Sequence, residues 1–139
     1  MTRVTGLSAR SENILNEELK ELARAFLLSE KIQDKLFKNA VLSAIVECLI
    51  PRGRVVYLPN GNVIRIIYNG TPKSSKARAL LVDMWAYQAT DEFVRGYIDK
   101  LPAEFLSDLR KAIPQSRPKL TVGRLPLPWK ESMERYHEK

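Results

Sequence analysis

The sequence contains little of what enzymes and metal sites are built from. Among its 139 residues there is one cysteine, Cys48, one histidine, His137, and six scattered glycines. A lone cysteine cannot form an internal disulfide and is typical of a reducing compartment. One histidine and one cysteine cannot complete a structural zinc site, and the glycines form neither a dinucleotide fingerprint nor a phosphate loop. We therefore expect no enzymatic activity, no catalytic residue, no metal and no cofactor.

Long apolar runs are also missing. No run approaches the roughly 20 residues needed to cross a bilayer, and the first six residues lack the apolar core of a signal peptide. Hydrophobic residues make up 45% of the chain and charged residues 28%, which is typical of a globular domain. We expect an intracellular protein, cytoplasmic or nuclear, with no membrane partner.

The net charge of +7 is unevenly distributed along the chain. Residues 51–82 hold six basic and no acidic side chains, residues 83–109 hold two basic and six acidic ones, and residues 110–139 hold eight basic and three acidic ones. Basic residues interleaved with tyrosines are typical of single-strand binders. One hypothesis is therefore a nucleic-acid-binding helical module that uses 51–82 and the tail. Its candidate phosphate-binding residues are Arg52, Arg54, Arg65, Lys73, Lys76 and Arg78. The competing interpretation is that this basic segment faces the acidic segment 83–109, within the fold or across a dimer.

Apolar residues at steps of three and four predict most of the secondary structure. Helices are expected at about 12–29, 34–49, 75–88, 90–98 and 102–113, the last ended by Pro114. In the second helix a broad apolar stripe that includes Leu36, Ala40 and Cys48 indicates burial, which would make the thiol an inert core group. Trp85 shares a face with Leu81 and is expected in the core.

The segment 54–68 has two interpretations. Two β-branched runs flank Asn60-Gly61, which is a strong local signal for a β-hairpin. The alternative is a loop followed by a short helix from about Asn62 to Asn69-Gly70. Pro59, beside the turn, weakens the hairpin.

Four prolines from Pro114 onward predict an extended arm. The end of the chain, 129–139, predicts a short helix with Trp129, Met133 and Tyr136 on one face. Tryptophan is enriched in binding hot spots and a proline-stiffened segment loses little entropy on docking. The candidate partner-binding residues are Leu125, Leu127, Trp129, Met133 and Tyr136. The alternative is that the arm folds back and covers the protein's own core.

Several stretches resemble one known family. They are ELARAFLLSEKIQD (21–34), FKNAV (37–41), IRIIYNGTP (64–72), LLVDMWA (80–86) and LPAEFLSDL (101–109). Together they are similar to the C-terminal helical half of fungal BTB/POZ domain proteins, while the strand–helix core of that family has no counterpart here. The resemblance covers about 5–113 and implies a helical interaction module, with loop plus helix at 54–68. Proteins of this family dimerise and recruit protein partners.

These observations predict an all-α domain of five or six helices over residues 1–113 and a proline-rich arm over 114–139. The expected function is non-catalytic protein–protein interaction, by self-association or by docking a protein partner. If the chain is the helical half of a BTB domain, the first two helices would expose Leu15, Leu19 and Leu22 unless they pair with a second copy.

Overall fold

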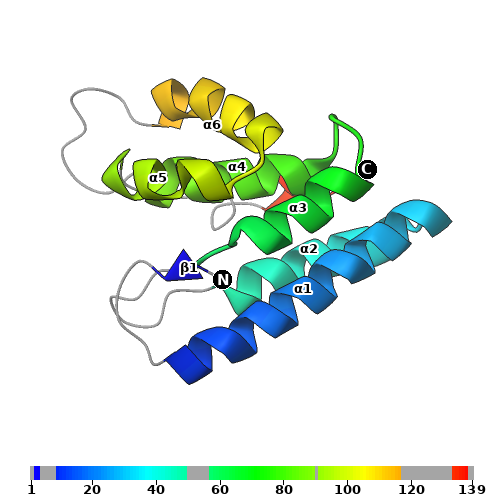
Figure 1. The fold of residues 1–139 in the computed structure, drawn as a ribbon. Helices are drawn as coiled ribbons and strands as arrows, with labels where there is room; N and C mark the ends of the chain where they lie inside the picture. Colours follow the sequence, from blue (N-terminus) through cyan, green and yellow to red (C-terminus); the bar gives the residue numbers. More distant parts are fainter. Residues whose placement is uncertain (1, 4–8, 50–56, 90, 117–132, 138–139) are drawn as a thin grey trace.

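The computed structural model describes residues 2–3, 9–49, 57–89, 91–116 and 133–137. Within these ranges the fold is all-α, as predicted, with six α-helices, two short 3-10 helices and one pair of two-residue strands. The helices are α1 (Ala9–Ile32), α2 (Lys35–Cys48), α3 (Gly61–Gly70), α4 (Lys76–Gln88), α5 (Asp91–Tyr97), η1 (Ile98–Lys100), α6 (Ala103–Ser116) and η2 (Met133–Tyr136). Figure 1 shows α1 and α2 side by side, with α4, α5 and α6 grouped apart from them and α3 lying between the two groups.

The first two helices form an antiparallel pair around a tight turn. Gln33 adopts a left-handed φ of 52°, and the Asp34 carboxylate caps α2 by accepting the backbone N–H of Phe37 at 3.0 Å. Leu15 and Leu19 are buried within the single chain. The expectation that these two residues stay uncovered without a second copy is therefore wrong, because α2 and α3 pack on α1.

The predicted apolar stripe of α2 is too broad at its N-terminal end. Leu36 is 82% exposed and Ala40 is also exposed, whereas Val41, Leu42 and Ile45 are buried. Leu36 precedes Val41 by five residues and so lies about 140° around the helix from it. The core covers only one side of α2, and Leu36 is on the other side.

The segment around Asn60-Gly61 is helical, so the hairpin alternative is wrong there. The Asn60 side chain caps α3 by accepting the N–H of Val63 at 3.1 Å. Just before it, β2 (Tyr57–Leu58) pairs antiparallel with β1 (Thr2–Arg3). A Cβ on Gly61 would lie 2.5 Å from the carbonyl oxygen of Lys100. This glycine is needed for close approach to a neighbouring backbone, not for a hairpin turn.

Helix α4 runs through the core. Ser75 caps it, and most of its apolar side chains are buried. Trp85 is fully buried, as predicted, and its indole N–H donates to the carbonyl of Pro59 at 3.0 Å. Rings of Phe93, Tyr97 and Phe105 surround the indole. Trp85 therefore ties α4 to the segment before α3 and to the later helices.

Helix α6 continues to Ser116, so the expectation that it ends at Pro114 is wrong. The fixed φ of proline is close to the helical value, so a proline can occupy a last turn where few further backbone hydrogen bonds depend on it.

Candidate interaction surfaces

The basic residues predicted to bind phosphate are described only in part. Arg52 and Arg54 lie outside the described residues. Lys73 is exposed, while Lys76 donates from Nζ to the carbonyl oxygen of Arg135 at 3.3 Å. Arg65 is exposed and belongs to α3, whereas Lys76 belongs to α4.

Arg78 has a structural role, which corrects its assignment as a phosphate-binding residue. Its side chain is buried, and its guanidinium donates to the carbonyls of Tyr68 and Thr71 and to the Thr71 hydroxyl. It also forms an ion pair with Glu104 at 2.9 Å and lies over the Tyr68 ring. Arg78 thus satisfies carbonyls at the C-terminal end of α3, where a cation is favourable.

The predicted partner-binding tail is described only at its end. Leu125, Leu127 and Trp129 lie outside the described residues, and Met133 is described only by its place in η2. Tyr136 is 2% exposed and belongs to the protein's own core. The assignment of Tyr136 to partner binding is therefore corrected: η2 packs on α4 and α2, so residues 133–137 follow the alternative in which the arm folds back.

Two side-chain contacts hold this turn. The Tyr136 hydroxyl donates to Oδ2 of Asp83 at 2.6 Å, and the His137 ring nitrogen Nε2 lies 3.2 Å from the Ser43 hydroxyl. Burial raises the pKa of the Asp83 carboxyl, against the lowering effect of the hydrogen bond from Tyr136. Burial and the hydrogen bond to Asp83 raise the pKa of the Tyr136 hydroxyl. Tyr136 is therefore a neutral donor at neutral pH.

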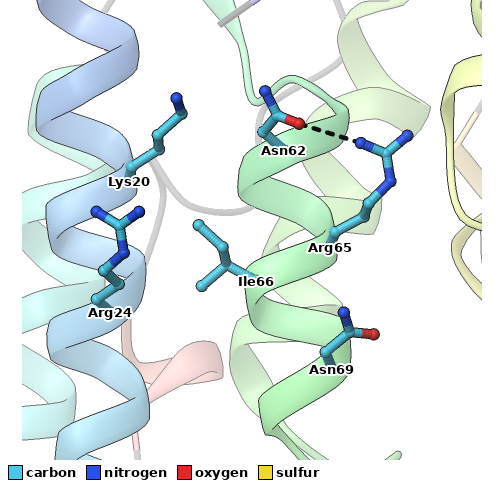
Figure 2. A pocket seen from close by; sticks show the side chains of 6 residues that line it. All are labelled: Lys20, Arg24, Asn62, Arg65, Ile66 and Asn69. Atoms are coloured by element: carbon cyan, nitrogen blue, oxygen red, sulfur yellow. Dashed lines mark hydrogen bonds between the residues drawn. The ribbon is translucent and has the colours of Figure 1, made fainter.

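A basic groove lies between α1 and α3 and has a volume of about 440 Å³. The basic groove is lined by six side chains, which are drawn in Figure 2: Lys20, Arg24, Asn62, Arg65, Ile66 and Asn69. Lys20 and Arg24 come from α1, and the other four from α3. Figure 2 shows Ile66 pointing toward α1, whereas Arg65 and Asn69 extend from the side of α3 away from α1, with Arg65 hydrogen-bonded to Asn62. Of these six residues, only Arg65 was a candidate site residue in the sequence analysis. The local sequence pattern does not indicate that α1 and α3 are neighbours.

The cations of the groove have weak internal partners. Lys20 pairs with Glu17 at 3.4 Å and Arg24 with Glu21 at 3.2 Å, and both glutamates are more than 70% exposed. The Arg65 guanidinium donates to the Asn62 side-chain oxygen at 3.1 Å and to the Lys100 carbonyl at 2.6 Å. Exposed pairs of this spacing contribute only about 0.2–0.5 kcal/mol. An external anion can therefore compete for Lys20 and Arg24.

An aliphatic end, defined here as Leu28, Ile32 and Leu36, lies where α1 turns into α2. These side chains are 51%, 56% and 82% exposed. Single exposed apolar residues are common on protein surfaces, but here three large ones lie within nine residues around one turn. Periodicity missed this feature because it assigned Leu36 to the buried stripe of α2.

Among the described residues, no group of three or more histidine, cysteine, aspartate or glutamate side chains could hold a metal ion. Tyr68 donates from its hydroxyl to Oδ2 of Asp108 at 2.8 Å, and burial together with this bond raises the pKa of the tyrosine. This pair ties α3 to α6.

The chain was compared with protein-family models, with curated proteins and with solved structures, and none of them matches. The resemblance to the helical half of fungal BTB/POZ proteins therefore stays a prediction. Within the described ranges, no helix has the length and apolar character that crossing a membrane requires.

Proposed function

We propose that this protein is a non-catalytic protein–protein interaction module that docks a partner on its aliphatic end. The observation that carries the proposal is the exposure of Leu28, Ile32 and Leu36 at one end of the α1–α2 pair. Full burial of a leucine or isoleucine side chain contributes about 1.5–3 kcal/mol of free energy. Since each of these three side chains is at least half exposed, each would contribute about 1–2 kcal/mol to the binding free energy on docking.

The charges beside the aliphatic end favour an acidic, amphipathic partner segment. Lys31 is exposed there, next to the apolar residues in sequence. The two nearby carboxylates are already engaged: Glu30 pairs with Lys38, and Asp34 accepts the N–H of Phe37. A second copy docked end to end would bring lysines against lysines, whereas a segment with apolar residues flanked by carboxylates is complementary.

The proposal is tested by selecting peptide ligands from a random library displayed against the full chain. We expect ligands that combine aliphatic or aromatic residues with aspartate or glutamate. Their affinity, measured by calorimetry, should fall at least tenfold in Leu28→Gln and in Leu36→Gln. Ile14→Gln is the matched control, because Ile14 is 62% exposed on the same helix but near its other end.

Three outcomes would overturn this proposal. The first is a selection that yields no ligand sensitive to Leu36→Gln. The second is equal loss of affinity in the Ile14→Gln control. The third is self-association in sedimentation equilibrium that Leu36→Gln abolishes, which would make a second copy the occupant. Circular dichroism of each variant verifies that it is folded.

The rival hypothesis is a nucleic-acid-binding module. The burial of Arg78 and the intramolecular contact of Lys76 weaken it, because both residues belonged to its predicted phosphate site.

A further inference from the structure

We infer that the basic groove between α1 and α3 binds an acidic peptide segment, the continuation of the segment docked on the aliphatic end. This inference rests on the proposed function and names a second contact of the same partner. Arg24, in the groove, and Leu28, in the aliphatic end, are one helical turn apart on α1. A single peptide can therefore reach both surfaces.

The cations of the groove come from both helices. Lys20 and Arg24 lie on α1, and Arg65 extends from the far side of α3, where it donates to the Lys100 carbonyl. None of the six lining residues is acidic. Among the described residues, Glu17 and Glu21 supply the carboxylates paired with these cations, and both are strongly exposed and are displaced at little cost. Carboxylates of a ligand would gain new charge-assisted hydrogen bonds here.

Two asparagine side chains of the groove can form hydrogen bonds with the main chain of a peptide. Asn62 and Asn69 are seven residues apart on α3, which is two turns or about 10.5 Å along the helix axis. That distance matches about three residues of extended chain. A carboxamide carries donors and an acceptor, so it can pair with a peptide N–H and C=O. Both side chains are exposed and line the groove.

The lining favours a peptide over a nucleic acid. No aromatic side chain among the six residues offers a stacking surface for bases. Ile66, between the walls, offers apolar contact to the stems of ligand side chains.

The inference is tested with the full chain and a labelled hexaglutamate peptide. Fluorescence anisotropy and ¹⁵N–¹H spectra are followed during titration, with hexaglutamine as the uncharged control. We expect binding of hexaglutamate only, with amide shifts in α1 and α3 around the groove. Lys20→Gln and Arg65→Gln should each weaken binding at least threefold. Lys111→Gln, which removes an exposed lysine on α6, should leave it unchanged.

Each contrary result overturns the inference. If Lys111→Gln weakens binding as much as Lys20→Gln, the attraction is a general effect of net charge. If oligo-dT binds more tightly than hexaglutamate and shifts the same amides, the groove is a nucleic-acid site. If hexaglutamate fails to bind while selected peptides still depend on Leu36, the groove assignment is wrong and the proposed function stands.

Discussion

Replacing Arg78 tests whether one buried cation holds the end of α3 against α4 and α6. Its guanidinium contacts four oxygen atoms: the carbonyls of Tyr68 and Thr71, the Thr71 hydroxyl and the Glu104 carboxylate. Arg78→Met retains most of the side-chain volume and removes the three hydrogen bonds and the ion pair with Glu104. The variant therefore isolates the polar contacts from the cost of a cavity.

The expected loss of stability depends on which hydrogen-bonding partners of Arg78 stay buried once its guanidinium is removed. A hydrogen bond to a charged group contributes about 1.5–3 kcal/mol, and contacts of one group are not additive. Glu104 is 44% exposed, so it regains water when Arg78 is lost. The helix-end carbonyls are less able to do so. We expect a loss on the order of 3 kcal/mol for Arg78→Met, about 2 kcal/mol for Arg78→Lys, and under about 1 kcal/mol for Glu104→Gln.

Urea unfolding followed by tryptophan fluorescence measures these differences, since Trp85 is fully buried. In a chain of this length 1 kcal/mol corresponds to about 3–4 °C in Tm. The order of the three variants is the decisive result. If Glu104→Gln is as damaging as Arg78→Met, the ion pair dominates and the account based on the carbonyls of α3 is refuted. Full stability of Arg78→Met would refute any structural role.

Three further predictions concern close approach and the terminal turn. Gly61→Ala should destabilise by about 1–2 kcal/mol, because its Cβ would meet the Lys100 carbonyl, whereas Gly96→Ala, with nothing within 4 Å, should stabilise by about 0.4–1 kcal/mol in the same urea assay. Tyr136→Phe should cost about 1–2 kcal/mol, since it removes the donor to the half-buried Asp83; an unchanged Tm would contradict the assigned contact. Burial raises the pKa of Asp83 in the folded state, so its contribution is most favourable at low pH and is lost as the pH rises through that pKa. Asp83→Asn keeps an acceptor and should gain stability relative to the wild type as the pH rises above the ordinary pKa of an aspartate, and a difference independent of pH would refute this assignment.

Much of the local structure could be predicted from the residues alone. Three-and-four spacing of apolar residues located the long helices, and Asp34 and Ser75 cap two of them as their side-chain chemistry suggests. The burial of Trp85 also followed from its place on an apolar face. At Asn60-Gly61 the local signal was ambiguous, because the same pair of residues suits a hairpin turn and a capped helix start.

The surfaces were decided by tertiary structure. Periodicity tells which residues share a face of a helix, but it does not tell which faces meet another element. Leu36 belongs to an apolar pattern and lies in solvent, whereas Arg78 belongs to a basic segment and lies in the core. The groove between α1 and α3 joins Lys20 to Arg65, which no local pattern relates. The sequence by itself determined an all-α chain and its helices; the packing of those helices decided which charges and aliphatic side chains remain for a partner.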